Sequence, residues 1–226
     1  MFGSLQNFTT YSILSGLGEV DEWVNRACQL KYDFIGVSEK NNLASVMKFQ
    51  EATADRNLDV LFGEEFHVTS DVRGDGVDWH VLLYATSQTG YQNLITLNNK
   101  AHDPECGLGR YPRLDLDVIE QWHEDLVAVV PPVLRNLQFL DRHVDVLNDV
   151  HRLFGHDDCY LGLNPMSSTD QSLFTSMEDW KRTFVFDAHM PKRDQHYLYE
   201  EVRKIDRSSE KKHYNLDRSF DNGYLP

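Results

Sequence analysis

The segment VDEWVNRACQL at Val20–Leu30, followed by FIGV at Phe34–Val37, decides the fold class. The first segment carries apolar residues at helical spacing on one face, namely Val20, Trp23, Val24 and Ala27. The second is a short apolar run, which predicts a buried strand. An amphipathic helix that leads directly into a buried strand is typical of an α/β fold with mostly parallel strands.

The same alternation extends along most of the chain. We expect further strands at Leu5–Phe8, Asp59–Phe62, Trp79–Ala85, Leu126–Val130, Tyr160–Leu163 and Thr183–Phe186. We expect further helices at Leu43–Ala54, Tyr91–Lys100, Leu116–Trp122, Val144–Phe154 and Asp194–Ile205. Gly155 is expected to end the helix that precedes it. Six or seven β/α units predict a barrel in a single domain at residues 1–206, with a polar tail at residues 207–226.

Composition restricts the classes of protein to consider. A chain of 226 residues with 41% apolar content can bury one substantial core. Its net charge of -14 argues against a surface that grips a phosphate backbone unaided, so DNA is expected to be contacted only indirectly. The three cysteines form no CxxC pair, which favours a reducing compartment. With no apolar run near the ~20 residues of a membrane span and no signal-like N-terminus, we expect a cytoplasmic protein without a membrane partner.

An ordered series of short segments carries a family resemblance. They are YSILSGL at Tyr11–Leu17, FIGVSEKNNL at Phe34–Leu43, GEEFHV at Gly63–Val68, HVLL at His80–Leu83, GYQNL at Gly90–Leu94, YPRLD at Tyr111–Asp115 and DAH at Asp187–His189. In this order they resemble the polymerase and histidinol phosphatase (PHP) domain of the bacterial and phage DNA polymerase III alpha subunit, a family C replicative polymerase. The resemblance implies a distorted, TIM-like (β/α)7 barrel.

The resemblance also implies a metal site that is largely lost here. In that family, carboxylates and histidines at the strand ends hold several divalent metals for phosphoester hydrolysis. The positions matching these ligands but changed in this chain are Gln6, Phe8, Glu39, Lys40 and Pro132. A phenyl ring cannot bind a metal, and a fixed ammonium repels a cation. The family ligand positions that survive are Glu65, His80, Asp187 and His189.

Each surviving residue also has a structural explanation. Asp187 and His189 suit either a metal or a simple ion pair, and Glu65 is either a ligand or a solvated carboxylate in a turn. His80, at the start of an apolar strand, is either a ligand or a hydrogen-bonded structural histidine. The remaining histidines, His67 among them, are expected mostly at the surface.

Lys40 suggests a further hypothesis. Its ammonium is expected to take roughly the space of a lost metal and to pair with Glu65, Asp187 or Glu39, because a buried carboxylate cluster without a counter-cation is costly. The alternative is a lysine that faces solvent.

Two principal functions remain open, and the lost ligands favour the first. In the first, the chain is a noncatalytic module that supports the core of a family C polymerase, docks a separate proofreading exonuclease, or does both, and it needs no cofactor. In the second, it is a metal-dependent phosphoesterase acting as a 3′–5′ exonuclease with zinc or manganese in a reduced site. A third interpretation is a stand-alone phage interaction protein. Residues 220–226 resemble a junction to a polymerase palm, so the chain is expected to be either a piece of a larger polymerase or the product of a gene for this domain.

Overall fold

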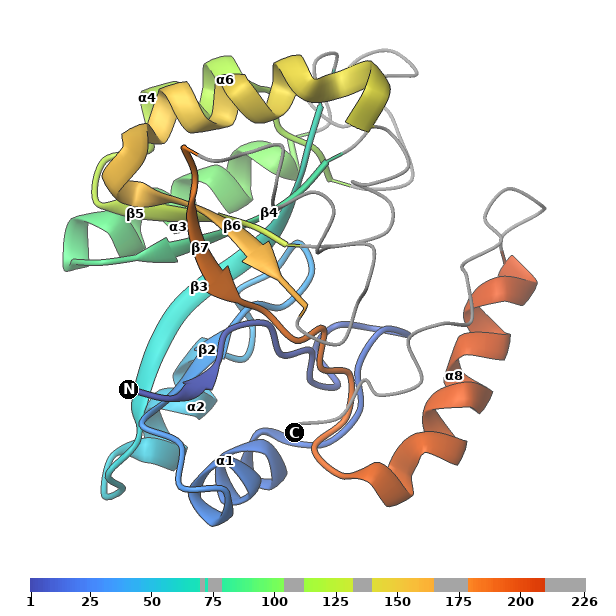
Figure 1. Ribbon diagram of the computed structural model, residues 1–226. Helices are drawn as coiled ribbons and strands as arrows, with labels where there is room; N and C mark the ends of the chain where they lie inside the picture. The colour runs from blue at the N-terminus through green and yellow to red at the C-terminus, as the bar shows by residue number, and fades with distance from the viewer. Residues whose placement is uncertain (70–71, 73–78, 104–111, 132–139, 165–178, 210–226) are drawn as a thin grey trace. The chain divides into compact units, whose positions relative to one another are not determined.

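The computed structural model describes residues 1–69, 72, 79–103, 112–131, 140–164 and 179–209, and its fold is mixed α/β (Figure 1). The chain divides into two compact units. The first unit comprises residues 1–39, 44–61 and 186–226, and the second comprises residues 40–43 and 62–185. The polar tail predicted for residues 207–226 lies mostly outside the described residues. The prediction of a single domain at residues 1–206 remains a prediction.

The first unit is built around a short parallel pair of strands. Its elements are β1 (Gly3–Ser4), α1 (Val20–Gln29), β2 (Phe34–Val37), α2 (Val46–Thr53), the 3-10 helix η1 (Arg193–Gln195) and α8 (His196–Ser209). Strand β1 pairs in parallel with β2, and α1 packs against both α2 and β2. The backbone N–H of Glu19 donates to the Glu22 carboxylate at 3.1 Å. This N–H at the start of α1 has no acceptor within the helix backbone, and the Glu22 side chain supplies one.

The second unit contains a mixed sheet covered by helices. Strand β3 (Asp59–Val68) starts in the first unit and continues into the second, where β4 (Trp79–Ala85), β5 (Leu126–Val130), β6 (Cys159–Leu163) and β7 (Lys181–Phe184) follow it in sheet order. The pairs β3–β4 and β4–β5 are antiparallel, whereas β5–β6 and β6–β7 are parallel. Strands β3, β5, β6 and β7 therefore run in the same direction, and β4 runs opposite to them.

Three helices of the second unit enclose its apolar core. They are α3 (Gln88–Ala101), α4 (Leu116–Gln121) and α6 (Leu140–Asp158), and Figure 1 shows them grouped beside β4, β5 and β6. The hydroxyl of Ser87 accepts from Gly90 N–H at 3.1 Å, and the carboxylate of Asp115 accepts from Val118 N–H at 2.9 Å, so α3 and α4 both begin at N-cap side chains. Leu94, Leu97 and Ile119 of these helices pack with strand residues such as Phe66 and Leu83.

Most predicted elements are confirmed, with shifted ends. The helix at residues 20–30 and the strands at 34–37, 79–85 and 126–130 match closely. The first strand was expected at Leu5–Phe8 but lies at Gly3–Ser4. Gly155 does not end α6, which continues to Asp158 with Gly155 at a φ of 73°. Within the described residues, no helix has the length and apolar character needed to cross a bilayer.

The adjacent residues Leu94 and Ile95 of α3 give a direct test of where the core lies. Leu94 is fully buried in the core of the second unit, whereas Ile95 is 39% exposed. We expect Leu94→Ala to lower the free energy of unfolding by about 2–5 kcal/mol, since it leaves a cavity among packed side chains. Urea unfolding measures this loss. The control Ile95→Ala should change it by less than about 1 kcal/mol, and equal losses in the two variants would contradict the packing described.

Candidate functional site

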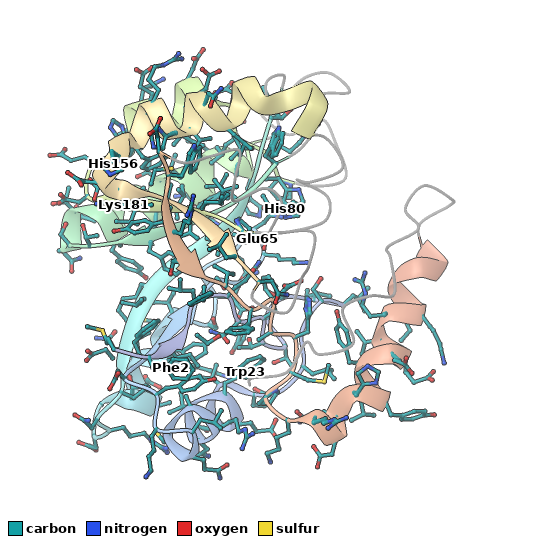
Figure 2. All side chains as sticks on the ribbon, in the orientation of Figure 1. Phe2, Trp23, Glu65, His80, His156 and Lys181 are labelled. Carbon is teal, nitrogen blue, oxygen red and sulfur yellow. The ribbon has the colours of Figure 1, made fainter. Side chains whose placement is uncertain are left out.

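Glu65, His67 and His80 form a buried polar cluster on the β3–β4 ladder of the second unit. Because side chains alternate along a strand, Glu65 and His67 share one face of β3. His67 lies directly opposite His80 of β4, and their ring centroids are 4.4 Å apart. His80 Nδ1 lies 2.8 Å from Glu65 Oε1 (Figure 2). Glu65, His67 and His80 are 1%, 5% and 3% exposed, so little of the cluster is open to bulk water.

The cluster has the donors of a transition-metal site. One ligand atom from each residue, a carboxylate oxygen or an imidazole nitrogen, lies within 4.8 Å of the other two. Carboxylate oxygen and imidazole nitrogen are common zinc ligands. The hydrogen bond between Glu65 and His80 also satisfies the buried carboxylate when no ion is bound. The arrangement therefore suits a metal without requiring one for folding.

Three expectations for these residues are corrected or refined. Glu65 is not a solvated carboxylate in a turn, because β3 continues to Val68 and buries it. His80 is hydrogen-bonded, as its structural interpretation predicted. His67 was expected at the surface and is buried. The error came from ending the strand at Phe62, because an alternating strand through EEFHV would have predicted that Glu65 and His67 share a face.

Glu64 is separated from its acidic neighbour by the alternation of β3. Its Oε1 accepts a hydrogen bond from Asn98 Nδ2 of α3 at 2.7 Å. Burial raises the pKa of Glu64 well above its ordinary value, and the Asn98 hydrogen bond opposes the rise only in part. Burial therefore disfavours the charged carboxylate of Glu64, which is the form that a metal binds.

Asp187 and His189 of the first unit lie within hydrogen-bond distance of each other. Asp187 Oδ2 lies 3.1 Å from His189 Nε2, and His189 Nδ1 lies 2.6 Å from the carbonyl oxygen of Ser15. An imidazolium can donate to both acceptors at once, whereas a neutral ring can donate to only one. The contact with the Ser15 carbonyl orients the ring so that Nε2 faces the Asp187 carboxylate.

Phe8, at a position matched to a family ligand, is now part of the packing around His189. The Phe8 side chain is fully buried, and its ring stacks on that of His189 with centroids 5.0 Å apart and planes 25° apart. The ring of Tyr199 from α8 also stacks on His189 at 4.9 Å. Gln6, another of the changed ligand positions, is buried as well. Aromatic contacts therefore fix His189 where the family resemblance implies metal ligands.

Glu39 is buried and held by hydrogen bonds within the first unit. Its carboxylate accepts from Thr9 N–H at 3.1 Å, from the Thr9 hydroxyl at 2.5 Å and from the Ser12 hydroxyl at 2.5 Å. Burial raises the pKa of Glu39, while the hydrogen bonds from Ser12 and Thr9 act to lower it. Its oxygens are thus directed at the chain's own donors.

The two remaining changed positions differ in what the structure describes. Lys40 is half-buried, its backbone forms a parallel bridge with Glu65, and Asn41 N–H donates to the Glu65 carbonyl at 3.0 Å. This places the Lys40 and Glu65 backbones side by side, and the predicted ammonium–carboxylate contact remains a prediction. Pro132 lies outside the described residues.

The residues do not fit the multi-metal cluster that the resemblance implies. Phe8 has no ligand atom, Lys40 carries a positive charge, and the Glu39 oxygens already accept three hydrogen bonds. A fit for a single ion remains at Glu65, His67 and His80.

The comparisons with known families and with known sequences agree on the family of this chain. The family model of the PHP domain matches residues 4–166. The DNA polymerase III alpha subunit of Aquifex aeolicus is 26% identical over 190 residues, covering 76% of this chain and 16% of the relative. The alpha subunit of Escherichia coli K12 is 29% identical over 128 residues, covering 57% of this chain and 11% of the relative. The chain thus spans about a sixth or less of these relatives.

Solved structures share the fold at low sequence identity. A Bifidobacterium adolescentis protein, described as a proposed metal-dependent phosphoesterase, aligns with a TM-score of 0.56 at 13% identity over 83% of this chain and 87% of that one. An amidohydrolase from Chromobacterium violaceum, solved with sulfate and no metal, aligns with a TM-score of 0.59 at 12% identity over 89% and 97% of the two chains. These likenesses confirm the predicted α/β barrel of the PHP type.

The hydrogen bonds to Glu39 predict a pH-dependent effect of Ser12→Ala. Because burial raises the pKa of Glu39 in the folded state, folding takes up protons between the ordinary glutamate pKa of about 4.3 and the raised value, and stability falls as pH rises through that window. Removing the Ser12 donor raises this pKa further. We expect a loss of about 1.5–3 kcal/mol in the free energy of unfolding at pH 8, and a smaller loss at pH 4.5, where the carboxyl is mostly protonated.

Urea unfolding of wild type and Ser12→Ala from pH 4.5 to 8 measures the difference. Thr10→Ala is the matched control, because Thr10 is exposed and its hydroxyl makes a long 3.4 Å contact with Glu19. The control should stay within about 0.5 kcal/mol of wild type at every pH. If the loss of unfolding free energy in Ser12→Ala does not grow with pH, the stabilising effect of the Ser12 hydroxyl does not come from its hydrogen bond to the Glu39 carboxylate.

Proposed function

The chain belongs to the PHP domain family, and from this premise we propose that it is a noncatalytic PHP module of a family C replicative DNA polymerase assembly. In this role it supports the polymerase core, docks a separate proofreading exonuclease, or does both, in the cytoplasm of a bacterium or a phage-infected cell. DNA is then reached through these partners. The net charge of -14 supports this, because an acidic surface does not itself attract a phosphate backbone.

One observation carries the proposal. The buried ring of Phe8 stacks on His189, whose two nitrogens face Asp187 and the Ser15 carbonyl. Hydrolysis of a phosphoester by clustered metals needs ligand lone pairs and room for the ions. In the first unit those requirements are replaced by aromatic packing, the contact between Asp187 and His189 and the hydrogen-bonded Glu39 carboxylate.

A second candidate function is a metal-dependent phosphoesterase that acts as a 3′–5′ exonuclease. The buried Glu65, His67 and His80 cluster favours it, and the similar Bifidobacterium adolescentis structure is described as a proposed enzyme of this class. Zinc or manganese bound at the surviving family ligand positions would polarise the phosphoryl oxygen and supply a hydroxide.

A nuclease assay separates the two functions. We expect no shortening of end-labelled single-stranded DNA with a free 3′ end, in Mn²⁺ or in Zn²⁺, beyond that in a protein-free sample, because the ligand set is incomplete. Asp187→Ala should be indistinguishable from wild type. Shortening that Asp187→Ala abolishes, while the surface variant Asp117→Ala retains it, would refute the noncatalytic role and establish the phosphoesterase.

The partner in the proposal requires a separate binding measurement. The chain should form a complex of defined stoichiometry with the purified family C polymerase of its own cell, or with that cell's proofreading exonuclease, when mixtures are analysed by light scattering after size-exclusion chromatography. The complex should survive 0.5 M NaCl, at which charge attraction is screened within about 4 Å. Independent elution from both proteins at micromolar concentrations would contradict the docking role.

A further inference from the structure

The geometry points to a mononuclear zinc-type site formed by Glu65, His67 and His80, which stabilises the β3–β4 ladder and takes no part in phosphoester hydrolysis. The site lies entirely within the second unit. It differs from the lost multi-metal cluster in using His67, which corresponds to none of the ligand positions implied by the family resemblance. This inference goes beyond the scaffold role and does not depend on it.

The sheet register brings the three side chains together before any ion binds. His67 and His80 are paired directly across the ladder, and Glu65 lies two residues before His67 on the same face of β3. Both strands are continuous backbone ladders from Gly63 to Val68 and from Trp79 to Tyr84. The ligands therefore sit on rigid elements, which lowers the cost of ordering them around an ion.

The separation of the donors fits one ion with small side-chain adjustments. Zinc ligands lie at about 2.0–2.2 Å from the ion, which in a tetrahedral site puts them about 3.4 Å from one another. The candidate atoms are within 4.8 Å of one another, and the Glu65–His80 pair is already at 2.8 Å. Rotations of the imidazole rings can therefore bring the three atoms around a common centre.

The chemistry of the donors favours zinc over the harder cations. Two imidazole nitrogens with one carboxylate suit zinc, whereas magnesium and calcium prefer sites built from oxygen ligands. Glu65 supplies one negative charge in a buried setting, where an ion pair with a cation is strong. The cluster would contribute three of the four zinc ligands, leaving one position for water or another small ligand.

The burial of the cluster assigns it a structural role. Its three residues are 5% exposed or less, so a DNA phosphate does not reach them unless the groups that cover them move. An ion that joins β3 to β4 adds its binding free energy to folding, because the unfolded chain does not hold the three ligands together. Zinc should accordingly raise the thermal stability of the protein.

The test measures zinc affinity and stability rather than enzyme activity. Metal-free full-length chain is titrated with Zn²⁺ against a chromophoric chelator, and its Tm is measured with and without Zn²⁺. Visible absorption of the Co²⁺-substituted protein reports whether the ion is tetrahedral. The variants are His67→Phe, which keeps an aromatic ring beside His80, and Glu65→Gln, which keeps the side-chain size. The controls are His102→Gln, at an exposed histidine, and Asp187→Ala.

We expect one equivalent of Zn²⁺ per wild-type chain and a Tm increase of about 5–10 °C at a hundredfold excess over Kd. Losing an outer hydrogen-bond partner of a metal ligand already weakens binding by about 10- to 100-fold, so His67→Phe and Glu65→Gln should each weaken it by at least about 100-fold. Both variants should also lose the Tm increase. His102→Gln and Asp187→Ala should bind like wild type.

The inference is overturned if folded wild type binds less than about a tenth of an equivalent at micromolar Zn²⁺, a concentration above the dissociation constants of structural zinc sites. It is also overturned if His67→Phe binds like wild type or if Asp187→Ala abolishes binding. Circular dichroism checks folding, and Glu65→Gln decides if His67→Phe does not fold. Zinc binding without nuclease activity supports both this site and the scaffold role, whereas nuclease activity that requires Asp187 refutes the scaffold role alone.

Discussion

The antiparallel ladder between β3 and β4 is the constraint on which the candidate site depends. It pairs Gly63 with Tyr84 and continues without interruption to Val68 opposite Trp79. Alternation along β3 directs Phe66 and Val68 into the apolar core of the second unit, and Glu65 and His67 to the other face. A one-residue slip would put the carboxylate and the imidazole into the apolar core and move the phenyl ring to the opposite face of the sheet. The packing of Phe66 therefore fixes the position of the polar cluster.

The buried carboxylates at two family ligand positions, Glu39 and Glu65, obey the same rule: each is held by donors close in space. Glu65 pairs with His80 in the second unit, and Glu39 accepts hydrogen bonds from Thr9 and Ser12 in the first. An unpaired charge at such a depth costs several kcal/mol, so the chain either neutralises it or surrounds it with donors. The difference lies in the donors. The oxygens of Glu39 are occupied by hydrogen bonds from hydroxyl and backbone amide groups. The partner of Glu65 is an imidazole, and a carboxylate with an imidazole can also bind a metal.

The sequence predicted the elements with strong periodicity and missed what depends on pairing across strands. The helix at 20–30 and the apolar run at 79–85 match the structure because each pattern is local. The end of β3 was missed because Gly63, Glu64 and Glu65 have the composition of a turn, and their burial follows from pairing with β4. His67 was consequently assigned to the surface. The stacking of Phe8 on His189, 181 positions further along the chain, leaves no trace in sequence spacing.

The first unit has side chains that argue against a bound metal, and the second has a cluster that suits one. The packing of the fold explains the side chains of the first unit but not the cluster of the second. Phe8 packed on His189 is a stable substitute for a ligand, since an aromatic contact replaces an ion. Glu65, His67 and His80 are different, because apolar residues of similar size in their places would cost the fold nothing or would stabilise it. A scaffold that needed only a packed sheet would gain nothing from two buried imidazoles on a carboxylate. The proposed ion would give those three side chains a role in stabilising the β3–β4 ladder, and it would not need the ligand positions that are changed in the first unit.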